Sequence, residues 1–356
     1  MCYLLILIYI DFKGQTLSYV EFGTDPNEKE KLEKTLQFDK IIVSIGETPN
    51  DQGVKGVYEH ALFMDQLPDA SKLYKTVLNR FEEASLVKNE EEQRNKLHFI
   101  VVGGGQTGVE TTGELRDLLY NTMADHYPEL KDKFQLTLFH RPEGVLTRLP
   151  EALSEFTKEH LIKSGVNLVS DKSVVEITKD FVKLSDNSQI AYGGIVWATG
   201  NKSVPLIQKL SDQVKIESGK LLVNNNFRLL DNDFNVISDN CFAIGDCSYI
   251  KDGPANCTAA TANMEAAHLT KALNSNNFDK PYEFKYLGSM AYLGNKAGVV
   301  DLNGSVMTGW KPALLWSIAY WAMSFDYKTM FYTLYYWINT RINGRKLTPI
   351  EDGTDN

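Results

Sequence analysis

Short apolar runs that end on glycine recur along this chain and predict strands in a protein core. Residues 38–46, 195–200 and 242–245 follow this pattern, and residues 99–102 lead directly into Gly103. Apolar runs of this length, rich in β-branched residues and bounded by glycine, are typical of buried strands. Since segments with helical periodicity lie between them, the pattern predicts an α/β fold.

The segments between these strands differ in the spacing of their apolar residues. Residues 68–87 have helical spacing and begin with proline, which predicts one amphipathic helix, whereas the wholly polar run 88–96 predicts a solvated linker. Residues 1–10 are too few to span a membrane and lack the features of a signal peptide, so they predict a buried strand or a truncated element. Further expected elements are a strand at 135–139, a helix at 153–162, a strand at 166–170, a hairpin at 174–190 and a helix at 258–269.

The apolar run 99–102 opens into a glycine-rich turn and then into a helix. Gly103 permits the tight turn, Gly105 leaves the backbone open to a pyrophosphate, and Gly108 lets the helix pack close to the strand. The phosphates would lie at the helix N-terminus, where free N–H groups favour an anion. A glycine-rich turn in an unrelated loop is the alternative, and the flanking strand and helix favour the nucleotide.

The end of the next strand bears on which nucleotide is bound. In a dinucleotide fold an acid at this position binds the 2′-hydroxyl of NAD, whereas a cation suits the 2′-phosphate of NADP. Here His140 and Arg141 follow the strand, which favours NADPH. The alternative, that both are ordinary solvated residues after a strand, stays open.

The strand at 242–245 ends in a carboxylate, Asp246. This carboxylate could accept hydrogen bonds from the hydroxyl groups of a cofactor, with Gly245 leaving the backbone open. An Asp that caps a helix is the alternative. The small side chains that begin the helix at 258–269 favour the cofactor, because they let a flat ring lie close against it.

Composition and charge exclude several classes of protein. The chain has 356 residues, 43% of them apolar, which indicates two or three domains with full cores. A net charge of −9 argues against nucleic acid as a partner. The four cysteines and six histidines show no spacing typical of metal ligands, so we predict no metal and reduced, structural thiols.

The C-terminal region differs from the rest of the chain. Residues 310–337 are rich in tryptophan and tyrosine and form two apolar pieces separated near Asp326, each shorter than a spanning helix. Aromatic residues favour the lipid–water boundary, and a local excess of cations suits an anionic membrane surface. The region therefore predicts membrane contact, with a buried helical hairpin or a dimer interface as the alternative. The cations between residues 305 and 346 are Lys311, Lys328, Arg341, Arg345 and Lys346.

Taken together in this order and spacing, the motifs resemble the type II NADH dehydrogenases, the single-chain, non-proton-pumping NADH:quinone oxidoreductases of mitochondria and bacteria. The resemblance covers residues 38–345. It rests on IIVSIGETPN, VVGGGQTGVE, VWATG, FAIGDC, TAATANMEAAHL, FKYLGSMAYLG and the tryptophan-rich tail. The chain lacks the Cys-x4-Cys pair that would make it similar to a disulfide reductase.

The resemblance implies two Rossmann-like domains of the disulfide-reductase flavoprotein type and a C-terminal membrane-binding helical segment. It implies a partial FAD-binding domain at 1–95, an NAD(P)-binding domain at 96–205, the second part of the FAD-binding domain at 206–304 and the membrane-associated segment at 305–356. Electrons would pass from NADH or NADPH through FAD to ubiquinone. A peripheral site on the mitochondrial inner membrane and a homodimer are also implied.

Residue by residue, the resemblance implies two sets of cofactor contacts and no acid or base with a named catalytic role. The nucleotide set is Gly103, Gly104, Gly105, Gly108, Glu110, Thr199 and Gly200, joined by His140 and Arg141. The FAD set is Gly46, Gly245, Asp246 and Ala259, with Asp246 on the ribityl chain. The quinone motif falls on Ala260 and Met264.

Three departures from the family pattern leave a second functional class open. The family begins with a GxGxxG unit for the FAD pyrophosphate, and nothing before Gly46 can serve, so we expect a chain truncated at its front. Ala260 and Met264 stand where the family has two glutamines one helical turn apart. His140 stands near the position of the family's acid. The alternative is a non-catalytic remnant that keeps nucleotide binding or a structural role.

Overall fold

The structure is a computed structural model that describes residues 5–21, 33–253, 255–324, 326–344 and 347. Cys2, Arg345 and Lys346, which enter the expectations above, lie outside these residues. The chain divides into two compact units, residues 1–48 with 201–286 and residues 49–200 with 287–356. These division points differ from our four-segment scheme, and the assignment of those segments to cofactors stays a prediction.

The first unit is built on short sheets around one apolar core. A parallel pair, β4 and β16, carries the predicted strands that end at Gly46 and Gly245. The N-terminal strand β1 is present, but it pairs with β2 at the surface: Ile10 is buried while Ile6 is 45% exposed, so the expectation of a buried strand is only partly met. Strand bounds in this unit are β1 Leu5–Asp11, β2 Thr16–Glu21, β3 Glu33–Gln37, β4 Ile41–Val43, β5 Glu47–Pro49, β13 Asn201–Ser203, β14 Ile216–Glu217, β15 Lys220–Val223, β16 Cys241–Ala243 and β17 Ser248–Ile250.

The described residues of the first unit include the α-helices α7 (Pro205–Lys209) and α8 (Ala259–Ser275). The hydroxyl of Thr258 accepts a hydrogen bond from the N–H of Thr261 and so caps α8. Asp246 instead lies in a one-turn 3-10 helix, Gly245–Cys247. The alternative of an Asp that caps the helix is therefore wrong.

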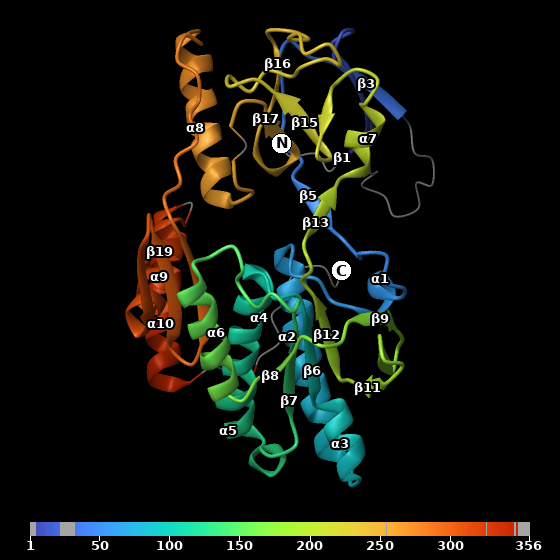
Figure 1. Cartoon of the computed structure of the whole chain (residues 1–356), viewed down its shortest axis with the longest axis vertical. Helices are drawn as coiled ribbons and strands as arrows, with labels where there is room; N and C mark the ends of the chain where they lie inside the picture. Colours follow the sequence, from blue (N-terminus) through green and yellow to red (C-terminus); the bar gives the residue numbers. More distant parts are fainter. Residues whose placement is uncertain (1–4, 22–32, 254, 325, 345–346, 348–356) are drawn as a thin grey trace. The chain divides into compact units, whose positions relative to one another are not determined.

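A four-stranded parallel sheet in the order β12-β6-β7-β8 forms the centre of the second unit (Figure 1). All residues of β6 are buried, as its continuous apolar run predicts. The predicted bounds of the strand at 135–139 are confirmed, and the predicted helices at 68–87 and 153–162 are confirmed as α2 and α6. The bounds are β6 His98–Val102, β7 Gln135–Phe139, β8 Asn167–Val169, β12 Gly194–Trp197, α1 Val57–His60, α2 Leu67–Leu86, α4 Gln106–Asp117, α5 Ala124–His126 and α6 Glu151–Lys163.

Two expectations for this unit need correction. Residues 88–96 are not a linker but contain helix α3 (Glu90–Lys96), since the side chain of Asn89 accepts hydrogen bonds from the N–H groups of Glu91 and Glu92. Acids in its first turn and bases in its last complement the helix dipole. The expected hairpin at 174–190 extends to a three-stranded antiparallel sheet of β9 Val174–Ile177, β10 Phe181–Leu184 and β11 Gln189–Ala191.

The C-terminal part of the second unit is an antiparallel sheet that packs against α4 and α6, followed by two helices, the first of which packs on the sheet (Figure 1). The two predicted apolar pieces are confirmed as α9 (Trp310–Ala322) and α10 (Tyr327–Asn343), with the N-cap Asp326 between them. Neither is long and apolar enough to cross a membrane, nor is any other helix in the described part of the chain. The sheet strands are β18 Ser289–Gly294, β19 Ala297–Leu302 and β20 Ser305–Gly309.

Candidate nucleotide and flavin sites

The glycine turn between β6 and α4 has no room for a side chain at Gly103 or at Gly108. Gly103 has φ +127°, and a Cβ there would lie 2.1 Å from the carbonyl oxygen of Ala198. A Cβ on Gly108 would lie 1.8 Å from the carbonyl oxygen of Gly103. The turn therefore depends on glycine for the close packing of helix against strand, as predicted.

Gly105 differs from these two glycines because it faces open space. A Cβ at this position would meet nothing within 4 Å, and its φ of −75° is ordinary for any residue. Gly105 is the N-cap of α4, no side chain caps the helix, and the first turn carries no acid. The N–H groups of a first helical turn have no partner within the helix. This end of α4 thus fits a pyrophosphate.

His140 and Arg141 lie beside this turn, at the end of β7. His140 is half-buried, its Nδ1 is 2.7 Å from the carbonyl oxygen of Arg141, and a Cβ on Gly104 would lie 2.7 Å from the Cβ of His140. Arg141 is exposed. The first acid after the strand, Glu143, is exposed in the adjoining turn. The structure thus brings His140 to the glycine turn and leaves the guanidinium group of Arg141 in solvent.

Glu110 lies one turn into α4, and the pKa of its carboxyl group departs from the ordinary value. Its Oε1 accepts hydrogen bonds from the indole N–H of Trp316 at 2.7 Å and from the backbone N–H of Tyr292 at 3.3 Å. Burial raises the pKa of Glu110 to about 7, although these donors act in the opposite direction. Sequence reasoning placed Glu110 in the site but missed Trp316 and Tyr292.

Two further predicted residues end the strand β12. Thr199 donates from its hydroxyl to the carbonyl oxygen of Asn50 at 3.1 Å, and Gly200 is exposed. The backbone N–H of Asn50 donates to the carbonyl oxygen of Gly200 at 3.0 Å. These bonds fix the loop after β12, and the role of both residues in nucleotide binding stays a prediction.

In the first unit, all four residues predicted to line FAD meet at one cavity. Gly46, Gly245, Asp246 and Ala259 border a space of about 430 Å³, together with small residues of α8 such as Ala262 and Ala266. Because these side chains of α8 are small, a flat ring can lie close against the helix. The residues present therefore fit a flavin at this cavity.

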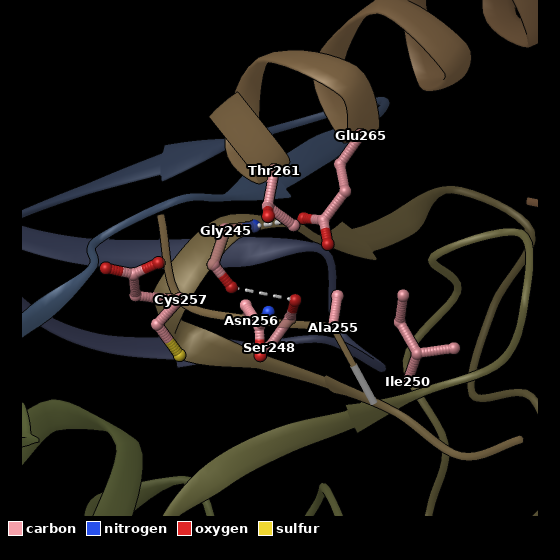
Figure 2. A pocket seen from close by; sticks show the side chains of 9 residues that line it. Gly245, Ser248, Ile250, Ala255, Asn256, Cys257, Thr261 and Glu265 are labelled. Atoms are coloured by element: carbon pink, nitrogen blue, oxygen red, sulfur yellow. Dashed lines mark hydrogen bonds between the residues drawn. The ribbon is translucent and has the colours of Figure 1, made fainter. Parts of the chain in front are cut away.

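A second, much smaller cavity of about 10 Å³ lies under the Gly245–Cys247 turn (Figure 2). Figure 2 shows Thr261 and Glu265 reaching from α8 towards Gly245. The buried carboxylate of Glu265 accepts a hydrogen bond of 2.6 Å from the N–H of Gly245, and burial raises its pKa. Ser248 donates to the carbonyl oxygen of Gly245 at 2.9 Å. Sequence reasoning did not identify Glu265 or Ser248.

A cation also contacts this turn. Lys220 donates to the carbonyl oxygen of Asp246 at 2.6 Å and forms an ion pair of 2.7 Å with Glu47. The pKa of the Asp246 carboxyl is raised, first by burial and then by the charge of Glu47. Asp246 is half-buried and borders both cavities, so it is accessible from the larger one.

The two positions of the quinone motif lie on α8 and offer no hydrogen-bonding side chain. Ala260 is exposed, whereas Met264 is half-buried and packs against the apolar core of the first unit. Neither residue is among those that line the cavity of about 430 Å³, although both lie on the helix that borders it.

Comparison with known proteins agrees with this arrangement. Residues 12–263 match the pyridine nucleotide-disulphide oxidoreductase family, and residues 286–346 match the NDH2 C-terminal domain. The chain is 29% identical to "Probable NADH dehydrogenase" of Dictyostelium discoideum over 88% of this chain and 69% of that protein. It is 26% identical to the external alternative NADH-ubiquinone oxidoreductase of Yarrowia lipolytica, over 92% of this chain and 66% of that protein.

A solved structure has the same fold. NDH2 from Plasmodium falciparum in complex with NADH is 21% identical, with a TM-score of 0.87 over 97% of this chain and 84% of that chain. The family match and the shared fold define a pyridine-nucleotide oxidoreductase. The chain belongs to the pyridine nucleotide-disulphide oxidoreductase family and, within it, to the type II NADH dehydrogenases.

Proposed function

We propose that this chain transfers electrons from NADH or NADPH through FAD to ubiquinone without pumping protons. The observation that carries the proposal is the pairing of two nucleotide-binding features in one chain. These are the uncapped N-terminus of α4 behind Gly105 and the small-residue cavity at Gly245 and Asp246. The relative from Yarrowia lipolytica, an NADH-ubiquinone oxidoreductase, supports the substrates.

When bound, FAD supplies the chemistry: it takes a hydride from the reduced nicotinamide and delivers electrons to a quinone. The residues of this chain bind and orient. The N–H groups of α4 beyond Gly105 hold the nucleotide pyrophosphate. Asp246, positioned by Lys220 and by the Glu265–Gly245 hydrogen bond, accepts hydrogen bonds from cofactor hydroxyl groups. Ala259 and Gly46 leave room for the ring.

For the quinone, Ala260 and Met264 offer apolar contact in place of hydrogen bonds. A quinone ring can stack on such a surface, with thioether and methyl groups supplying dispersion contacts. Orientation by side-chain hydrogen bonds is lost at these two positions. We therefore propose weaker discrimination between quinones with different ring substituents.

Membrane attachment through α9 and α10 is part of the proposal. Trp310, Leu314 and Ile318 of α9 are 65%, 52% and 48% exposed, and Phe331 and Tyr335 of α10 are 69% and 61% exposed. Apolar and aromatic side chains in contiguous exposed helices favour the lipid–water boundary. A homodimer through the same region and a place on the mitochondrial inner membrane are what the resemblance implies. The relatives from Yarrowia lipolytica and Solanum tuberosum, which are mitochondrial oxidoreductases, support the mitochondrial part of this proposal.

The visible absorption spectrum of the purified chain tests the redox function. The chain would be prepared in detergent, incubated with FAD, passed over a desalting column and measured before and after NADH or NADPH is added. We expect flavin bands that bleach on addition and return when a short-chain ubiquinone follows. A colourless protein that still binds NADH would contradict the proposal and support the non-catalytic remnant.

Sedimentation with vesicles that contain anionic lipid tests membrane attachment. The double variant Leu314→Glu/Ile318→Glu places two charges on the exposed side of α9 and should remain in the supernatant. The control, Leu86→Glu/Ile162→Glu, adds the same charges at two exposed apolar positions on α2 and α6 and should sediment like the unmodified chain. Equal sedimentation of all three proteins would place the membrane contact elsewhere.

A further inference from the structure

One face of the nucleotide-binding helix α4 is covered by the C-terminal sheet and by α9. The side chain of Gln106 donates to the carbonyl oxygen of Met290 at 2.8 Å. A Cβ on Gly113 would lie 2.5 Å from the backbone nitrogen of Gly294, so the two backbones are in direct contact. At the C-terminal end of the same face, Asp117 accepts a hydrogen bond of 2.6 Å from the hydroxyl of Tyr292. The contact runs the length of α4.

Glu110 lies in the middle of this contact, and its partners come from the C-terminal domain. Trp316 of α9 donates its indole N–H to Oε1 at 2.7 Å. The indole ring contacts two tyrosines, with ring centroids 5.4 Å from Tyr292 and 4.5 Å from Tyr320. These two ring contacts and the hydrogen bond to Glu110 restrict rotation of the indole, which favours one direction for its N–H. Trp316 is half-buried on a helix that otherwise exposes much of its apolar surface.

We propose that Trp316 is a positioning residue for Glu110, so that the seating of α9 on the second unit sets the orientation and charge of a carboxyl group on the nucleotide-binding helix. The structural pairing stands on the contacts above. Its consequence for nucleotide binding rests on the proposed function.

The direction of the effect follows from the groups that surround the carboxyl. Burial disfavours the ionised form and raises the pKa of Glu110, and the charge of Glu114 acts in the same direction. The donors from Trp316, Tyr292 and Gln106 favour the ionised form. Loss of the indole N–H therefore raises the pKa further. The groups that face Glu110 are Gln106 and Glu114 from α4, Tyr292 from β18, and Trp316 and Tyr320 from α9.

Because the pKa of Glu110 is about 7, both forms of the carboxyl are populated near neutral pH. A carboxylate close to the binding site of an anionic nucleotide opposes binding by charge and supports it by accepting hydrogen bonds. Whichever contribution is larger, affinity for NADH should change across the titration of Glu110. Displacement of α9 from Glu110 would shift the pH at which the affinity for NADH changes.

Indole N–H resonances measure the pair directly. In the ¹⁵N-labelled full chain in detergent micelles, single Trp→Phe variants assign the tryptophan resonances, and pH is varied from about 5.5 to about 9. The Trp316 resonance should titrate with a midpoint near neutral pH. It should be constant in Glu110→Gln and still titrate in Trp310→Phe, which changes an exposed tryptophan of the same helix. A Trp316 resonance that is constant in the unmodified chain, or that titrates equally in Glu110→Gln, would overturn the pairing.

Calorimetric titration with NADH over the same pH range tests the consequence. The pH midpoint of the dissociation constant should move upward by about one unit in Trp316→Phe and stay in place in Trp310→Phe. An unchanged midpoint in folded Trp316→Phe would overturn the link to nucleotide binding. If no variant and not even the unmodified chain binds NADH, the proposed function fails while the resonances still decide the pairing. If Trp316→Phe does not fold, the resonances of the unmodified chain and Glu110→Gln decide alone.

Discussion

The buried carboxylate of Glu265 accepts a hydrogen bond of 2.6 Å from the backbone N–H of Gly245, and so ties helix α8 to the turn that carries Asp246. A carboxylate that leaves water must find a donor, and a backbone N–H at the end of a strand must find an acceptor. Each group satisfies the other here. The bond therefore holds together two elements that border the larger cavity, the turn at Gly245 and the helix α8.

Removing this carboxylate should weaken both the fold and the cavity. Glu265→Ala leaves the Gly245 N–H without its acceptor and should lower the free energy of unfolding by about 1–3 kcal/mol. Glu265→Gln keeps an acceptor oxygen and should lose less. FAD affinity, measured by flavin fluorescence quenching, should fall about tenfold in Glu265→Ala. Glu283→Ala, at an exposed position of the same unit, serves as the control. Equal FAD affinity in all variants would show that Glu265 does not shape the cavity.

Strands and helices that are determined by their own residues could be predicted from the sequence. Strand β7 is the clearest case, because its predicted bounds agree with the structure. An apolar run closed by a charged turn contains all the information needed. The prediction for residues 88–96 was wrong. Their high charge suggested a solvated linker, but the side chain of Asn89 caps a helix, and acids in the first turn and bases in the last turn stabilise α3.

The partners of the site residues could not be predicted in this way. Glu110 and Trp316 are separated by 206 positions, and Gly245 and Glu265 by 20. No local pattern relates a glutamate in a dinucleotide helix to one particular tryptophan among five. The pairing depends on how the C-terminal sheet packs against α4, which is a tertiary property. Sequence therefore identified residues on which the cofactor chemistry is proposed to rest, but not the residues that hold them.

Glu110 should make stability depend on pH. Its pKa is raised from 4.5 in the unfolded chain to about 7 in the folded protein, so its contribution is fully present below pH 4.5 and is lost as pH rises through 7. The loss amounts to roughly 3 kcal/mol at most. Glu110→Gln removes the titration and should be more stable than the unmodified chain at alkaline pH, with little difference at acidic pH.

Urea unfolding at several pH values measures this difference. The exposed Glu155 on α6 provides the control, and Glu155→Gln should not show the same alkaline gain. If Glu110→Gln gives a constant difference from the unmodified chain at every pH, the carboxyl group does not titrate near neutral pH.

The residues after β7 should set the choice between the two nicotinamide cofactors. His140→Glu/Arg141→Ala supplies an acid for the ribose 2′-hydroxyl and removes a cation suited to the 2′-phosphate. The ratio of kcat/KM for NADH to that for NADPH should rise by about tenfold or more, as expected for a lost charge-assisted hydrogen bond. Lys131→Ala changes an exposed cation at the opposite end of β7 and should leave the ratio unchanged. An unchanged ratio in the double variant would mean that both residues are simply solvated.

Alanine substitutions at two glycines of the turn after β6 should separate an effect on nucleotide binding from an effect on stability. A Cβ on Gly105 meets nothing, and the φ of −75° suits alanine, so Gly105→Ala should keep or slightly increase stability, by up to about 1 kcal/mol. It should nevertheless weaken NADH binding at least tenfold, because the methyl group stands where the pyrophosphate would approach. Gly108→Ala places its methyl group 1.8 Å from the carbonyl oxygen of Gly103 and should destabilise the second unit. Calorimetric binding and thermal unfolding of both variants give the two readouts. If Gly105→Ala binds NADH as well as the unmodified chain, the pyrophosphate does not lie at the N-terminus of α4, and the glycine turn has only a packing role.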